Sequence, residues 1–71
     1  MRTKLVQLRE GMGYNQIQFS ALVGISRSHY AQIETGDKNP SLSVAMKIKK
    51  VAGYTGDDLF FNHERPETER L

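Results

Sequence analysis

The sequence predicts an all-α domain of five short helices, and three observations support this fold class. Short polar residues suited to cap helix N-termini recur along the chain, at Asn15, Ser26, Ser41 and Thr55. Glycine stands at the points where the helices must end, because it accepts the positive φ of a left-handed C-terminal residue. Apolar residues recur three and four positions apart, which places them on one face of a helix.

The first helix is expected to run from Thr3 or Lys4 to Met12. Glycines on both sides of Met12 loosen its C-terminal end. Its predicted buried stripe consists of Leu5, Leu8 and Met12.

The second helix is expected to begin at about Gln16 and to end at Gly24. Asn15 is the predicted N-cap, and Gln18 completes a capping box in which each side chain bonds the other residue's backbone N–H. The accompanying hydrophobic staple consists of Tyr14 and Phe19.

The third helix is expected over residues 27–35, because Ile25 and Ser26 repeat the staple and cap, with Tyr30 as the apolar partner. On a helical wheel Tyr30 and Ile33 face the core. The opposite face consists of Ser28, Ala31, Gln32 and Thr35, with Arg27 on its flank.

Residues 36–41 are dense in turn formers and are expected to form a loop. Ser41 caps a fourth helix that runs to about Ala52 and is stopped by Gly53. Its apolar face consists of Val44, Ala45, Ile48 and Val51 or Ala52. A short fifth helix is expected after Thr55.

The cap and staple of this fifth helix consist of Thr55, Asp58, Tyr54 and Leu59. One of the adjacent Phe60 and Phe61 is expected to fill the core, and the other to remain exposed for a partner. A single folded domain is therefore expected over residues 1–61. Residues 62–71 form a charged C-terminal tail with too little apolar surface to order itself.

Charge divides the chain into a basic body and an acidic end. The net charge is +2 over 71 residues, but residues 1–56 carry eight Lys and Arg against three acidic residues, and residues 57–71 carry a net −3. This pattern is typical of a nucleic-acid binder whose C-terminus faces away from the polyanion. A domain of this size buries only about 60% of its unfolded surface, so oligomerisation would help it.

Composition excludes several classes of site. There is no cysteine, so neither a disulfide nor a thiolate metal site is possible. No signal peptide and no apolar run of spanning length is recognised, so a cytoplasmic location is expected. His29 and His63 lie far apart without a metal-binding spacing, and no metal or other cofactor is expected. No catalytic histidine paired with a carboxylate is recognised, so an enzyme is not expected.

Residues 16–35 indicate two short helices joined by a tight turn at Gly24, the layout of a DNA-reading helix-turn-helix. The free face of the helix over residues 27–35 is polar and almost uncharged, which suits the major groove. Arg can bond a guanine edge with paired hydrogen bonds, Gln can do the same to adenine, and Ser suits either. Ordinary solvated positions would look the same, and the hairpin alone leaves both interpretations open.

Four separated segments resemble the Cro/cI-type helix-turn-helix family, also called the XRE family, of bacterial and phage repressors. They are LREGMGYNQ, VGISRS, QIETGDKNPSL and KIKKVAGYTGDDLF. The resemblance covers Lys4 to Phe61 and implies a compact five-helix, lambda-repressor-like domain with the helix-turn-helix at its second and third helices. It also implies a double-stranded DNA operator as the partner.

The resemblance further implies a role for each matching position. The base-reading positions are Arg27, Ser28 and Gln32. The DNA-backbone positions are Gln16, Lys38, Asn39, Ser41 and Ser43. Two more backbone contacts are expected at His29, for which a solvated side chain is an equal alternative, and at Tyr30. Tyr30 stands where the family prefers a branched aliphatic residue, and it can bury its ring while its hydroxyl reaches a phosphate.

Arg9 and Glu34 match a pair that links the first helix to the recognition helix through a largely buried salt bridge. Removing one partner is expected to cost about 3 to 5 kcal/mol. Ser20 stands where the family usually has Ala, and is small enough to keep the close helix contact. Ile17 and Leu22 occupy positions that are usually polar, and are expected to form an exposed apolar pair that contacts another subunit or the C-terminal segment.

The leading hypothesis is a sequence-specific regulator of transcription, a repressor that binds a palindromic operator as a homodimer. The alternative is a protein-binding module, such as an antitoxin, with DNA binding secondary. Its interface would use Ile17, Leu22 or residues 60–71. No membrane and no small-molecule ligand is expected in either case.

Overall fold

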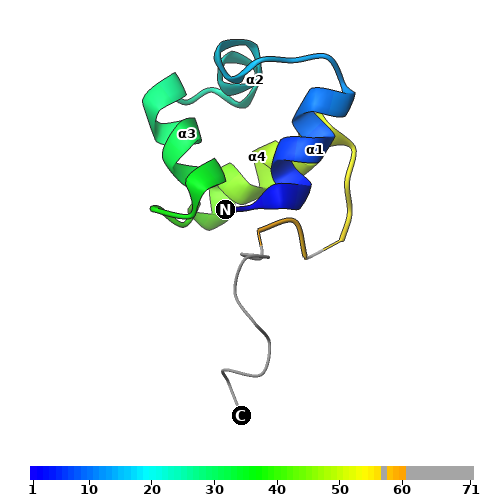
Figure 1. The fold of residues 1–71 in the computed structure, drawn as a ribbon. Coiled ribbons are helices and arrows are strands. Elements are labelled where there is room, and N and C mark those ends of the chain that lie inside the picture. Colours follow the sequence, from blue (N-terminus) through cyan, green and yellow to red (C-terminus); the bar gives the residue numbers. More distant parts are fainter. Residues whose placement is uncertain (57, 61–71) are drawn as a thin grey trace.

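The computed structural model describes residues 1–56 and 58–60, and this part of the chain folds into four α-helices and one 3₁₀ turn (Figure 1). The elements are α1 (Thr3–Gly11), α2 (Gln16–Val23), α3 (Arg27–Thr35), α4 (Leu42–Ala52) and the 3₁₀ turn Asp58–Phe60. The predicted all-α class is confirmed. Phe61 and the tail predicted over residues 62–71 lie outside the described residues.

Local capping sets where the helices begin. The Asn15 side chain accepts from the Gln18 backbone N–H at 2.7 Å, and the Gln18 side chain accepts from the Asn15 backbone N–H at 2.9 Å. Ser26 and Ser41 cap α3 and α4 in the same way, by accepting from the backbone N–H three residues on. The starts predicted for α2 and α3 are confirmed, and α4 follows its predicted cap directly.

The core lies where the apolar faces of the helices meet. The fully or almost fully buried apolar residues are Leu5, Phe19, Val23, Tyr30, Ile33, Ile48 and Leu59. The rings of Phe19 and Tyr30 pack with their centroids 5.2 Å apart, which joins α2 to α3. No helix in the described part of the chain is long and apolar enough to cross a membrane.

The predicted stripe of the first helix is wrong at its last member. Leu5 is buried and Leu8 packs against the core, but Met12 is 41% exposed. The helix ends at Gly11, and Gly13 adopts a left-handed conformation with φ of 83°. Met12 therefore lies at the cap, where the helical spacing that predicted its burial no longer applies.

The predicted count of five helices is also wrong for the described residues, where the segment after Thr55 holds the 3₁₀ turn Asp58–Phe60 in place of an α-helix. The Asp58 carboxylate accepts from the Tyr54 hydroxyl at 2.5 Å and pairs with the Lys4 ammonium at 3.1 Å. These contacts, the Tyr54 hydrogen bond above all, lower the pKa of Asp58. Leu59 is nevertheless fully buried and Phe60 packs against the core, so the 3₁₀ turn contributes apolar side chains to the core.

A buried ion pair joins α1 to α3. The Arg9 Nε donates to Glu34 Oε2 at 2.6 Å, and Arg9 also donates to the Tyr14 carbonyl at 2.8 Å. Only 2% of Glu34 is exposed, so its carboxylate has exchanged water for protein donors. The pair thereby fixes the position of α3 against α1 and the segment before α2.

Substituting Glu34→Ala should lower the free energy of unfolding by about 3 to 5 kcal/mol, because it leaves the Arg9 guanidinium buried without its counter-ion. Urea denaturation followed by circular dichroism measures this change. Glu10→Ala is the matched control, since Glu10 lies 3.8 Å from Arg9 but its side chain is 66% exposed. That control should change the stability by less than about 1 kcal/mol, and equal losses in the two variants would contradict the prediction.

Candidate nucleic-acid interface

The two helices of the predicted hairpin meet at a tight turn that begins at Gly24. Gly24 has φ of 91°, and its backbone N–H donates to the Ser20 carbonyl at 2.8 Å. A Cβ at Gly24 would meet nothing within 4 Å, so glycine is required there for its backbone conformation and not for space. Ser20 is only 3% exposed, in agreement with the close helix contact expected of a small residue.

The face of α3 that points away from the core is polar. Tyr30 and Ile33 are fully buried, as the helical wheel predicted. The residues on the outer side are Arg27, Ser28 and Thr35, which are exposed, and Ala31 and Gln32, which are half-buried. An outward face of this size and polarity matches the edges of bases in a major groove.

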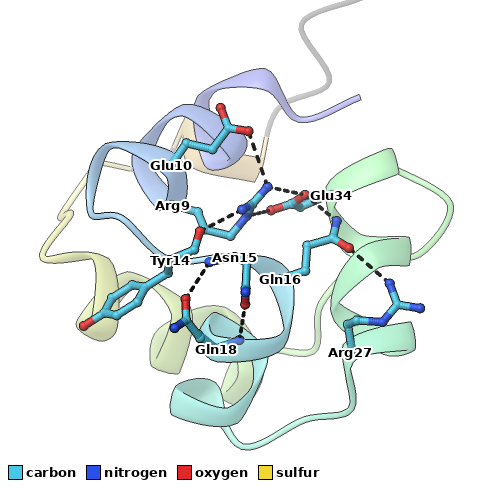
Figure 2. Close-up of polar contacts among 8 residues, drawn as sticks. All are labelled: Arg9, Glu10, Tyr14, Asn15, Gln16, Gln18, Arg27 and Glu34. Carbon is cyan, nitrogen blue, oxygen red and sulfur yellow. Dashed lines mark hydrogen bonds and ion pairs between the residues drawn. The ribbon is translucent and has the colours of Figure 1, made fainter.

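A chain of polar contacts connects the buried ion pair to Arg27 at the start of α3 (Figure 2). The Gln16 amide nitrogen donates to Glu34 Oε1 at 2.9 Å. Its carbonyl oxygen accepts from the Arg27 guanidinium at 3.3 Å. Gln16, the first residue of α2, therefore lies along the flank of α3 and holds Arg27 beside the polar face.

An open hollow of about 360 Å³ lies next to these residues at the N-terminal end of α2. It is lined by Arg9, Asn15, Gln16, Ile17 and Arg27. The positive end of the α2 dipole and the exposed Arg27 guanidinium both favour an anion at this position. The phosphate groups of DNA carry the negative charge that these groups favour.

The loop between α3 and α4, together with the first turn of α4, carries four more of the predicted DNA-backbone contacts. Its exposed residues include Lys38, Asn39 and Ser41, followed by Ser43 in the first turn of α4. The Ser41 hydroxyl oxygen already accepts the Val44 backbone N–H at 3.2 Å, and Asn39 Oδ1 accepts from Arg2 at 2.5 Å. Lys38 is the cation of this group, so it provides the group's charge toward a phosphate.

The expected phosphate contact of Tyr30 is wrong. The whole side chain is 0% exposed, and its hydroxyl oxygen is buried with no hydrogen-bond partner in the described part of the chain. Burial raises the pKa of Tyr30, and the charge of Glu34 acts in the same direction. The ring fills the space between α2 and α3 so completely that the hydroxyl does not reach the surface. The neighbouring His29 is half-buried, and its contact with DNA stays a prediction.

Arg2 is a residue of this region that the sequence did not identify. It is 5% exposed, and burial lowers its pKa. An arginine next to the first residue of the chain looks like a solvated terminal charge, and no spacing rule connects it to partners more than thirty residues away. No signal in the sequence predicted its burial.

The chain matches the helix-turn-helix family over residues 5–59, which include all of α2, α3 and α4. It therefore belongs to this family, and the resemblance to the Cro/cI, or XRE, type is confirmed. No solved structure matches the chain significantly.

Three similar proteins extend over most of the chain. An uncharacterized HTH-type transcriptional regulator, YgzD of Bacillus subtilis strain 168, is 39% identical over 64 residues, which are 90% of this chain and 97% of YgzD. Two uncharacterized HTH-type transcriptional regulators of Archaeoglobus fulgidus are 37% and 31% identical. The 37% match covers 84% of this chain and 86% of that relative, and the 31% match covers 99% of both chains.

Substituting Tyr30→Phe should leave the affinity for DNA within about twofold of the parent, because the hydroxyl does not reach the surface. A hydrogen bond to a charged phosphate would instead be worth about 1.5 to 3 kcal/mol. The free energy of unfolding should stay the same or rise by about 1 kcal/mol, since a buried hydroxyl without a partner is removed. Fluorescence anisotropy and thermal denaturation measure the two effects, and a clear loss of affinity in the folded variant would refute the buried placement.

Proposed function

We propose that this protein is a transcriptional repressor that binds a palindromic operator as a homodimer. The observation that carries the proposal is the outward polar face of α3, which stands on a fully buried apolar face of the same helix. A helix held this firmly can enter a major groove without losing its own packing. Occupancy of the operator then blocks transcription.

Three side chains are proposed to read bases, and each has a chemistry that suits an edge in the major groove. Arg27 pairs with a guanine, Gln32 with an adenine, and Ser28 with either. The hydrogen bond from Arg27 to Gln16 supports this assignment, because it holds the guanidinium at the start of the helix before DNA arrives. Pre-organisation of this kind reduces the ordering cost of binding.

Backbone phosphates are proposed to contact both sides of the reading helix. On one side lies the hollow that Gln16 and Arg27 help to line. On the other lie Lys38, Asn39 and the start of α4 around Ser41 and Ser43, where helix N-terminal amides suit a phosphate oxygen. Such contacts determine the register of the protein on the duplex and add affinity that is independent of sequence.

A homodimer is proposed because one recognition helix reads only a few base pairs. Two-fold symmetry with half-sites about 34 to 36 Å apart doubles the readout. The large exposed apolar residues on α2 and α4 support contact with another chain, and they are Ile17, Leu22, Leu42 and Met46. We place the protein in the cytoplasm, at the nucleoid, where the operator is.

The same exposed side chains favour a second candidate function, a protein-binding module of the antitoxin type. Ile17 is 64% exposed and Leu22 is 52% exposed, and both lie on α2 as the sequence predicted. Isolated apolar residues are common on protein surfaces, so this observation is weaker than the shape of α3.

Selection of binding sites from random double-stranded DNA should enrich a palindrome at physiological salt. Gln32→Ala should relax the preference at one or two base pairs per half-site, at a cost of about 1 to 3 kcal/mol in specific binding, because the adenine edge loses its partner. Sequencing of the selected pools for the parent and the variant measures this shift. If nothing is enriched, the repressor proposal fails and the protein-binding function takes its place.

Lys38→Ala should weaken binding to all sequences alike, because a phosphate contact carries no sequence information. The slope of log K against log salt should fall by about 1, as expected for one lost ionic contact. Titrations at several salt concentrations give this slope. Lys50→Ala is the control, since it removes the same charge from an exposed position at the far end of α4 and should leave the slope unchanged. Equal slopes in the two variants would refute the assignment of Lys38.

A further inference from the structure

Arg2 connects three parts of the chain that are distant in sequence. Its guanidinium donates to the Ile33 carbonyl at 2.5 Å, near the end of α3, and to the Phe60 carbonyl at 2.7 Å, in the 3₁₀ turn. It also donates to the Lys38 carbonyl at 3.0 Å and to Asn39 Oδ1 at 2.5 Å. The N-terminus accordingly lies beside the end of α3 (Figure 1).

The loop after α3 is bonded both to α3 and to Arg2. Its first residues are tied to α3 itself, where the Lys38 backbone N–H donates to the Gln32 carbonyl at 3.1 Å and the Asp37 backbone N–H donates to the Thr35 hydroxyl at 3.4 Å. The Lys38 carbonyl and the Asn39 side chain point instead to Arg2. Arg2 therefore links Lys38 and Asn39 to the N-terminal segment, in addition to the bond that links Lys38 to α3.

Only an arginine suits this position. A planar guanidinium presents its N–H donors in a fixed fork, so one group can serve acceptors that lie on different sides. Within the described part of the chain, the buried guanidinium donates its hydrogen bonds to backbone carbonyl oxygens and to one side-chain amide oxygen. A lysine ammonium is a compact charge on a flexible stem and does not reproduce this fork.

We propose that Arg2 is a positioning residue for the DNA-backbone contact of the loop. It holds Lys38 and Asn39 at a fixed distance from α3. Phosphates can then contact the protein on both sides of the reading helix while the protein keeps one register on the duplex. Since 95% of its surface is covered by protein, Arg2 acts through the loop and does not touch DNA itself. The proposal rests on the proposed function, because it requires that Lys38 contacts a phosphate.

The test is Arg2→Lys, which keeps the charge and removes the fork. The slope of log K against log salt should fall by about 1, as if a surface cation had been deleted, and affinity should fall about fivefold for all sequences alike. In this background Lys38→Ala should lower the slope by less than it does in the parent, because the contact is already lost. The base preference of the selected sites should not change.

Tyr54→Phe is the matched control for a loosened C-terminal turn. It removes the hydroxyl that bonds Asp58 and Lys4, and it conserves charge. Its salt slope should equal that of the parent. Circular dichroism and thermal denaturation establish that each variant is folded at the temperature of the titrations. If Arg2→Lys is folded and keeps the parent slope, the proposal is overturned.

A failure of the proposed function is distinguished by Lys38→Ala in the parent background. If that variant keeps the parent slope, Lys38 is not a backbone contact, and this part of the proposed function fails. If Lys38→Ala lowers the slope while Arg2→Lys does not, the proposal that Arg2 positions the loop fails. Should Arg2→Lys fail to fold, Asn39→Ala removes one acceptor of Arg2 without changing the charge. Because Asn39 is uncharged, loss of its own DNA contact would not change the slope, so a lower slope reports a displaced Lys38. That variant should lower the slope, and an unchanged slope in it overturns the proposal.

Discussion

The buried ion pair between Arg9 and Glu34 is the interaction on which the rest of the structure depends. Removing two charges from water is costly, and this cost is offset only when every donor and acceptor finds a partner. Here the Glu34 carboxylate accepts from both Arg9 and Gln16, and Arg9 also donates to the Tyr14 carbonyl. These partners come from α1, α2, α3 and the segment before α2, so one buried network links all three helices.

The same requirement shapes the proposed DNA-binding surface. Gln16 transmits the position of the ion pair to Arg27, at the start of α3. At the other end of the helix, Arg2 and Arg9 hold the last turn through the Ile33 carbonyl and the Glu34 carboxylate. Because α3 is anchored by buried cations at its end and by apolar side chains on its inner face, its polar face is left free for a ligand.

Signals that act within three or four residues were sufficient to predict most of the helical architecture. A cap bonds an amide three residues away, so Asn15 and Ser26 reveal the starts of α2 and α3 without knowledge of the rest of the fold. The orientation of α3 was also predictable, because the burial of Tyr30 and Ile33 follows helical periodicity. The resemblance to known repressors added the pairing of Arg9 with Glu34, which no local rule contains.

The sequence by itself therefore determined the class of fold, the starts of the helices and the outward face of α3, since each of these depends on neighbours along the chain. Only the tertiary structure decided that Met12 is exposed, that the Tyr30 hydroxyl is buried, and that Asp58 pairs with Lys4 at the start of a 3₁₀ turn. The same holds for Arg2, whose burial depends on carbonyls at the end of α3, in the loop and in the 3₁₀ turn. The physical reason is that burial and long-range hydrogen bonding depend on which distant groups meet, and that information appears only when the helices have packed.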